Sequence, residues 1–231
     1  MNIQIQKPLF TDNVGKKADY NESISPKDGT ATSDCRLFIV CNGVGSSASG
    51  ETASSIACDS LQAYLNSFVD PEEDFLPEFI EKAVRYTEIR FDDYVSGNTA
   101  AKEMAVTFSM MYIAKNGVFV THTGDCCVYQ FRDGKVFFKT QKDADTFHVT
   151  DIQPNDLFML TTGVVPQSLS DEELNWIFSS RYPYEDKIEL LKKCCDLKSM
   201  DSFSAYLVPI LSVDNMDPFK QVMTSLLHAF V

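Results

Sequence analysis

The apolar residues of the chain switch between the period of a strand and the period of a helix. The run "CRLFIVC" (35–41) is continuously apolar, which is typical of a strand buried on both faces. From Ser49 to Phe68 apolar residues recur every three or four positions, so this segment is predicted to be a helix with Ser49 as its N-cap. Pro71 ends that unit, and Glu72–Glu73 are expected to open a second long helix, because acidic residues suit a first helical turn.

The middle of the chain has the pattern of short strands joined by tight turns. "KNG" (115–117) and "RDG" (132–134) are typical of hairpin turns, which need the positive φ that Asn-Gly and Asp-Gly permit. The predicted strands are 2–10, 35–41, 104–114, 117–123, 126–132, 135–140, 156–162 and 202–211, and the further predicted helices are 170–180, 184–196 and 217–230. Hairpinned strands with helices grouped outside them favour antiparallel sheet covered by helices over alternating βαβ units.

Composition narrows the class of protein. The chain has 231 residues, 44% of them hydrophobic, which fits one large domain better than two small ones. A formal charge of -13 argues against a nucleic-acid or anionic-membrane surface, and no stretch approaches the roughly 20 apolar residues of a membrane span. The first ten residues lack the layout of a signal peptide, and seven cysteines without a CxxC pair suit buried thiols. We therefore expect a cytoplasmic protein.

Five motifs follow one another in the order found in one enzyme family. They are "NES" (21–23), "LFIVCNGVGSSASGETAS" (37–54), "VTHTGDCCVYQFRDGKV" (120–136), "NDLFMLTTGVVPQSLSDEEL" (155–174) and "DSFSAYLVPI" (201–210). In that order they resemble the Asn-Glu-Asp, Asp-Gly-x-Gly-Gly, Gly-Asp-Ser-Arg, Ser-Asp-Gly and Asp-Asn-x-Thr segments of the PP2C-type (PPM family) Ser/Thr protein phosphatases. The resemblance covers about residues 15 to 211. It implies an α+β fold, a four-layer α-β-β-α sandwich of two antiparallel sheets flanked by helices.

The resemblance also implies a chemistry, the hydrolysis of phosphoserine or phosphothreonine at a centre of two Mg²⁺ or Mn²⁺ ions. Carboxylates must offset the repulsion between such ions. The sequence departs from the family pattern at Ala18 (the expected phosphate-gripping Arg), Ser23 (the Asp of Asn-Glu-Asp), Asn42 (the bridging Asp), Thr162 (the Asp of Ser-Asp-Gly) and Pro166 (a further Asp). We therefore expect no catalytic residue and no resident cofactor, with Mg or Mn required only if the chain is an enzyme.

Other positions of the pattern remain. Glu22, Gly43 through its carbonyl group, Asp125 and Asp201 match the family, and Glu22, Gly43 and Asp201 are expected to hold at most one weakly bound ion. Lys16 and Lys17 lie beside Ala18, where they either contact phosphate as point charges or simply form a solvated turn. The connection 140–155 is short, whereas the family usually carries a flap there. His122 and His148 are interpreted as strand and loop residues rather than metal ligands, and Cys126 and Cys127 as packing residues.

These features predict a pseudophosphatase, a PP2C-like domain (1–211) that acts as a protein-binding or regulatory module. Its partner would be a protein such as a phosphoprotein, a kinase or a phosphatase. One alternative is a divergent metal-dependent phosphatase that uses a single loosely held ion. A third is a structural subunit that assembles through the amphipathic segment 212–231, which either docks on its own domain or engages a partner or second copy. The oligomeric state stays open.

Overall fold

The computed structural model describes residues 1–15, 21–44, 47–70, 73–98, 104–141 and 145–214, without the side chains of residues 47 and 48. The expected phosphate contacts Lys16 and Lys17, the position of Ala18 and the predicted helix 217–230 lie outside these residues. Within the described part of the chain, no helix is both long enough and apolar enough to cross a membrane.

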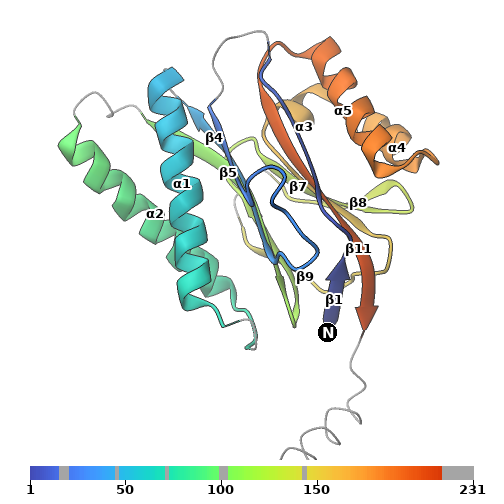
Figure 1. Ribbon diagram of the computed structural model, residues 1–231, viewed down its shortest axis with the longest axis horizontal. Coiled ribbons are helices and arrows are strands. Elements are labelled where there is room, and N and C mark those ends of the chain that lie inside the picture. The colour runs from blue at the N-terminus through green and yellow to red at the C-terminus, as the bar shows by residue number, and fades with distance from the viewer. Residues whose placement is uncertain (16–20, 45–46, 71–72, 99–103, 142–144, 215–231) are drawn as a thin grey trace, which may run out of the picture.

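Two antiparallel sheets form the centre of the molecule (Figure 1). The first contains β1 (Asn2–Ile5), β2 (Leu9–Asn13), β7 (Cys127–Arg132), β8 (Lys135–Lys139), β10 (Leu157–Thr161) and β11 (Phe203–Asp214). Its order is β1-β11-β10-β7-β8, and β2 also pairs with β11. The second contains β3 (Glu22–Ser25), β4 (Leu37–Val44), β5 (Ala105–Ala114), β6 (Gly117–His122) and β9 (Phe147–Val149), in the order β3-β4-β5-β6-β9.

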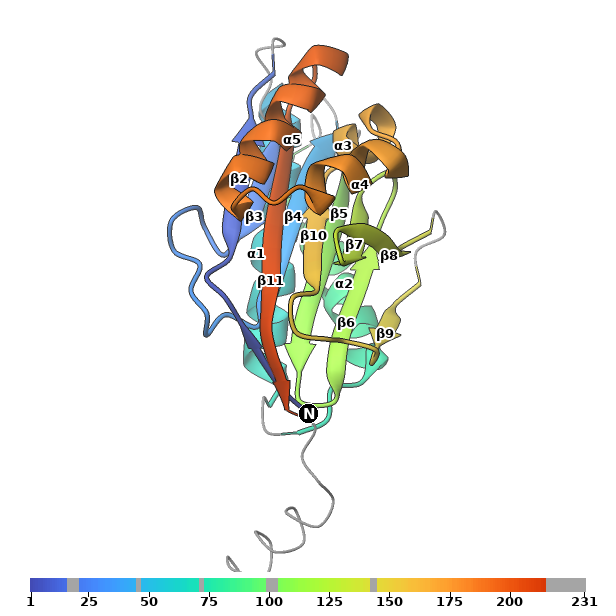
Figure 2. The ribbon, with the colours of Figure 1, turned by 90° about the vertical axis from the view of Figure 1, so that its right-hand side faces the viewer.

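Helices cover the outer face of each sheet. The first sheet carries α3 (Val164–Ser168), α4 (Asp171–Ser179) and α5 (Tyr184–Lys198), which lie in front of β11, β10 and β7 in Figure 2. The second sheet carries α1 (Ser47–Phe68) and α2 (Pro77–Gly97). This arrangement confirms the predicted α-β-β-α sandwich.

Strand alternation explains why a continuously apolar strand was needed at β4. Phe38 and Val40 belong to the core between the two sheets, whereas Ile39 and Cys41 belong to the core beneath α1 and α2. Successive side chains of a strand point to opposite faces, so a strand between two cores buries every residue. Residues 37–41 of β4 are all buried, as the sequence predicted.

The two predicted hairpin turns are present, and they differ in which residues have positive φ. In the β7–β8 turn, Asp133 (φ 51°) and Gly134 (φ 74°) both have positive φ, as predicted for Asp-Gly. In the β5–β6 turn, positive φ occurs at Gly117 (142°). The Asn116 side chain there donates to the Phe75 carbonyl (2.9 Å) and accepts from its N–H (3.2 Å). Asn116 thus fixes the segment between α1 and α2 against the hairpin.

The expected start of the second helix was wrong, since α2 begins at Pro77 rather than at Glu72–Glu73. Leu76 is extended (φ -115°, ψ 142°), as expected for a residue that precedes proline, and Pro77 suits the first turn of a helix. Phe75 is buried against the rings of Tyr112 and Phe119. Tertiary packing of Phe75 therefore keeps the preceding segment out of the helix.

Other element predictions needed smaller corrections. The strand predicted at 2–10 is two strands, β1 and β2, which pair with different parts of β11. Pro8 lies between them and lacks the N–H that a continuous ladder requires. The short elements β3, β9 and α3 were not predicted. β11 continues to Asp214, so residues 212–214 of the predicted tail are strand, and the division of the chain at 211 stays a prediction.

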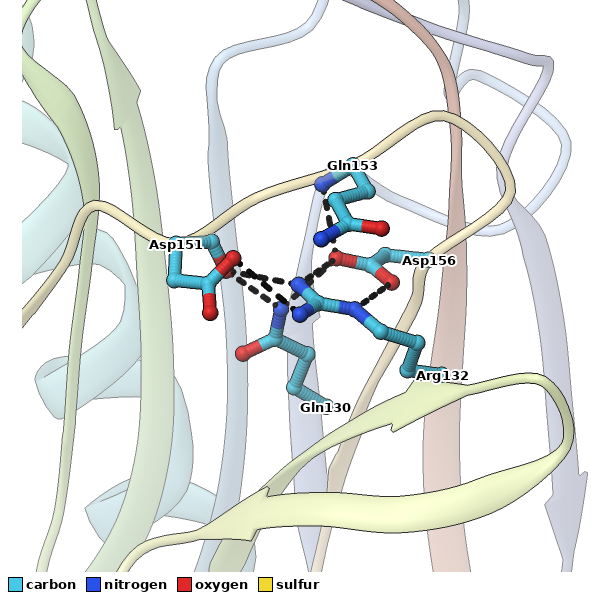
Figure 3. A network of polar contacts seen from close by, with 5 residues as sticks. All are labelled: Gln130, Arg132, Asp151, Gln153 and Asp156. Atoms are coloured by element: carbon cyan, nitrogen blue, oxygen red, sulfur yellow. Dashed lines mark hydrogen bonds and ion pairs between the residues drawn. The ribbon is translucent and has the colours of Figure 1, made fainter.

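A network of polar side chains fixes the short connection between β8 and β10 (Figure 3). Arg132 donates to both carboxylate oxygens of Asp156, at 2.9 and 2.8 Å. Asp156 also accepts from the Gln130 side chain and from the Gln153 N–H, both at 2.8 Å. Arg132 reaches Asp151 as well, at 3.1 Å between charged groups. The end of β7 therefore holds the connection at Asp151 and Asp156, and the bond from Gln153 to Asp156 ties the connection to itself.

Candidate functional site

The candidate site lies where strands of the two sheets end close together. Glu22 begins β3, and it is directly opposite Asn42 in the pairing of β3 with β4. Thr162 follows β10, and Ser204 is near the start of β11. Glu22 is an acidic residue, yet it is only 5% exposed and lies on the face of β3 that borders the apolar core between the sheets.

Hydroxyl groups from the first sheet occupy the Glu22 carboxylate. Thr162 Oγ1 donates to Glu22 Oε1 at 3.2 Å, and Ser204 Oγ donates to Glu22 Oε2. The Ser204 N–H in turn donates to Thr162 Oγ1 at 3.2 Å. A carboxylate of one sheet is thus hydrogen-bonded on both oxygens by hydroxyls of the other sheet. This arrangement closes the space between the sheets at this end of the molecule.

Burial changes the titration of Glu22. Loss of solvation raises the pKa of its carboxyl group to about 7, against the opposing influence of hydrogen bonds from Ser204 and Thr162, which favour the charged form. The nearby charge of Asp12 adds to the rise. Near neutral pH, Glu22 therefore carries much less than a full negative charge.

The raised pKa of Glu22 predicts a pH dependence of stability. The folded state binds a proton at Glu22 up to about pH 7, whereas the unfolded chain releases it near 4.5, so stability falls as pH rises between these values. The loss should reach about 3 kcal/mol by pH 8. Urea unfolding at pH 5 and pH 8 should show a flatter dependence in Glu22→Gln than in the wild type. An equal dependence in both proteins would contradict this assignment.

Backbone contacts shape the end of β4 beside Glu22. The Gly43 N–H donates to the Asn21 carbonyl at 2.8 Å. A Cβ at Gly43 would lie 1.8 Å from the Gly50 carbonyl oxygen, so the first turn of α1 requires glycine here. The Asn42 side chain lies on the same strand face as Phe38 and Val40, toward the opposite sheet. Asn42 and Gly43 therefore lie beside Glu22, at the end of β4.

Ser23 lies on the other face of β3. Its hydroxyl group is 2.9 Å from Ser54 Oγ of α1. Adjacent residues of a strand point to opposite faces, so the Ser23 side chain is directed toward the helical layer while Glu22 is directed between the sheets. The side chains of Ser23 and Glu22 therefore point in opposite directions, and that of Ser23 is not directed into the site.

Asp125 lies against the turn that follows β10. A Cβ at Gly163 would lie 2.2 Å from the Asp125 carboxylate, so glycine next to Thr162 makes room for this side chain. The Gln167 side chain of α3 donates to Asp125 at 2.6 Å. Pro166 of the same helix lines a cavity of about 740 Å³ together with Asp125. Asp125 thus lies beside Gly163, the residue that follows Thr162, and Pro166 lines the same cavity as Asp125.

Asp201 lies in the loop before β11 and is exposed. Its N–H donates to Ser199 Oγ at 3.1 Å. A Cβ at Gly15 would come within 2.6 Å of the Met200 carbonyl oxygen. The end of the described segment 1–15 therefore packs against the Asp201 loop.

The cysteines and histidines mostly pack. Burial raises the pKa of Cys126 to about 12 and that of Cys127 above its usual value, which leaves both as unreactive thiols. His148 stacks on Phe119, with ring centroids 4.2 Å apart. His122 differs, because it is 2% exposed and its Nδ1 has no hydrogen-bond partner among the described residues.

Sequence reasoning missed Ser204 and the special position of His122. Both could have been found from alternation. Ser204 precedes Tyr206 and Val208 on the face of β11 that forms the core between the sheets, and His122 follows Val120 in the same way on β6. Where a polar residue follows apolar residues on the same face of a strand, the apolar core ends, and a functional site can lie beside that residue.

Comparisons with known proteins agree with this fold. Residues 25–173, more than half of the chain, match the family model described as Protein phosphatase 2C. Among curated proteins, none matches the chain.

Several solved structures share the fold. The Mycobacterium tuberculosis serine/threonine phosphatase PstP/Ppp has a TM-score of 0.72 at 16% identity, over 91% of this chain and 100% of that one. The catalytic domain of PstP in complex with two manganese ions gives 0.75 at 17% identity, with the same coverage. PppA of Pseudomonas aeruginosa, a key regulatory component of T6SS, gives 0.67 at 16% identity, over 90% and 100% of the two chains. These structures agree in fold, and the match to the family model over residues 25–173 shows that the chain belongs to the protein phosphatase 2C family.

Proposed function

We propose that this protein is a pseudophosphatase, a PP2C-like domain that binds a protein partner and regulates it without hydrolysing phosphate. The observation that carries the proposal is the environment of Glu22. Both of its carboxylate oxygens accept hydrogen bonds from the neutral hydroxyls of Thr162 and Ser204, and its partner in register is the neutral amide of Asn42.

A two-metal centre needs a different set of donors. Mg²⁺ and Mn²⁺ prefer carboxylate oxygens, and two adjacent ions need several negative charges to offset their repulsion. Within the described residues, no three His, Cys, Asp or Glu side chains gather closely enough to hold an ion. Thr162 and Asn42 contribute no charge, so the residues present do not fit a pair of dications, and we derive no hydrolytic step.

The partner in this proposal is a protein such as a phosphoprotein, a kinase or a phosphatase. PppA, a key regulatory component of T6SS, shares this fold, and its role is compatible with a regulatory function of this protein. All seven cysteines are free, which suits the reducing environment of a cytoplasm.

Hydrolysis and metal binding test the proposal together. We expect no turnover of p-nitrophenyl phosphate or of a phosphothreonine peptide above background at millimolar Mn²⁺. Calorimetric titration with Mn²⁺ should show no binding or one weak ion. Turnover on the order of 1 per second that Asp201→Ala abolishes, together with two ions bound at micromolar concentration, would instead identify a divergent metal-dependent phosphatase.

A further inference from the structure

A groove that includes Asp125 has features that the proposed function does not use. Its first part is the cavity of about 740 Å³ between the start of β7, the end of β8 and the α3–α4 segment. A second cavity of about 790 Å³ continues along β8 and shares Lys139, Gln141 and Asp171 with the first. The two hollows are therefore parts of one groove, which we call the β8 groove.

The charges around the first cavity are unbalanced. The Lys139 ammonium group donates to both carboxylate oxygens of Asp171 at 2.8 Å, so these two charges offset each other. Asp125 accepts only from the neutral Gln167 amide among the contacts described, and none of the ion pairs within the described residues involves Glu172. Two negative charges, both on exposed side chains, thus remain in the lining of the hollow, where they would attract a cation.

His122 gives a second and independent sign of a ligand. It lines the first cavity, and the alternation of β6 directs it to the same side as Val118 and Val120. Its Nδ1 is buried without a partner among the described residues, although buried polar atoms are nearly always hydrogen-bonded. Burial lowers the pKa of His122, so the ring is neutral at pH 7 and one of its nitrogens is a hydrogen-bond acceptor.

The second cavity adds apolar surface. It is lined by Phe137, which is half exposed, and by Phe138 and Phe147, whose rings pack edge to face at 5.4 Å. A groove with acidic groups and an unpartnered buried ring nitrogen in one part, and aromatic side chains in the next, suits a chain of alternating character rather than a small ion.

We propose that the β8 groove binds an extended segment of a partner protein that carries an arginine or lysine, with the cation between Asp125 and Glu172 above His122 and neighbouring apolar side chains on Phe137 and Phe147. This inference rests on the proposed binding function and specifies the chemistry that its partner must present. The chain as a whole has a charge of -13, so a test must separate this groove from general attraction.

Fluorescence anisotropy of the full chain with two labelled peptides supplies that test. One is a decapeptide of Ala, Ser and Leu with a single central Arg, and the other carries the neutral isostere citrulline in its place. We expect the Arg peptide to bind about tenfold more tightly, a difference of about 1.4 kcal/mol. Its affinity should fall with added salt. Equal binding of the two peptides, or no binding of the Arg peptide at millimolar protein, would overturn the proposal.

Matched variants locate the binding. Glu172 is an exposed glutamate in the first turn of α4, and Glu185 is an exposed glutamate in the first turn of α5. Of the two, only Glu172 lines the groove. Glu172→Gln should weaken binding of the Arg peptide about fivefold, and Glu185→Gln should leave it unchanged. Equal effects of the two variants would mean that the overall charge, not the groove, attracts the peptide.

His122→Leu separates binding from folding. Leucine removes an unpartnered buried nitrogen, so the melting temperature should stay the same or rise, while affinity for the Arg peptide falls about fivefold. Unchanged affinity would remove His122 from the site. Hydrolysis assays on the same samples keep the outcomes distinct, because detectable turnover contradicts the pseudophosphatase proposal while loss of peptide binding contradicts only this one.

Discussion

Asp156→Ala is expected to lower the free energy of unfolding by about 3 to 5 kcal/mol. The side chain of Asp156 is 1% exposed and that of Arg132 is 15% exposed, and they form two hydrogen bonds of 2.9 and 2.8 Å. Removal of the carboxylate leaves the guanidinium group without its bidentate partner and deprives Gln130 and the Gln153 N–H of an acceptor. For a domain of this size the melting temperature should fall by about 10 °C, measurable by calorimetry.

A surface ion pair of the same length is the matched control. Lys139 donates to Asp171 at 2.8 Å, but both side chains are at least 40% exposed. Solvent screens such a pair, so Asp171→Ala should cost less than about 1 kcal/mol. If Asp156→Ala is no more harmful than Asp171→Ala, the network in Figure 3 does not stabilise the fold.

The Asp156 network also supports the site from a distance. Asp156 immediately precedes β10, and Thr162 immediately follows it. The five residues of β10 are all buried and pair on both sides, with β7 and β11. A network that fixes the connection before β10 therefore helps to fix the position of β10 in its sheet, and with it the position from which Thr162 contacts Glu22.

Much of the fold could be predicted because many of its elements are determined by residues that are close together in the sequence. The continuous apolar run of β4 and the Asp133–Gly134 turn each depend on neighbours in the chain, and both were predicted. The start of α2 could not be, because it depends on Phe75 packing against residues about forty positions away. β3 and α3 were missed for a different reason, as segments of four and five residues are too short to show a period.

The candidate site was predictable only in part, and the directions of its side chains were not predictable. The motifs identified Glu22, Asn42 and Thr162 as candidate residues, and the structure places all three at one end of the sheets. The face on which a side chain lies follows from strand register, which motif matching does not give. Ser23 therefore turned out to contact Ser54 of α1, and Ser204 turned out to contact Glu22.

Restoring two carboxylates should restore metal binding. In Asn42→Asp/Thr162→Asp, both new carboxylates would lie on the side of Glu22, because Asn42 is opposite Glu22 in register and Thr162 Oγ1 is 3.2 Å from its carboxylate. Without metal, this variant should be less stable than the wild type, since three acidic groups repel one another in a buried place. At an Mn²⁺ concentration of 100 times the dissociation constant, binding stabilises the folded state by about 2.7 kcal/mol.

Thermal unfolding with and without Mn²⁺ measures the effect. The melting temperature of the double variant should rise by about 5 to 10 °C on addition of Mn²⁺, and that of the wild type should not change. Asn42→Asp/Thr162→Asn is the matched control, because it keeps the size of the Thr162 replacement and omits its charge. A similar rise in the control would mean that shape limits ion binding here. No rise in the double variant would mean that charge at these two positions is not what the site lacks, since the donors would be present and the ion still would not bind.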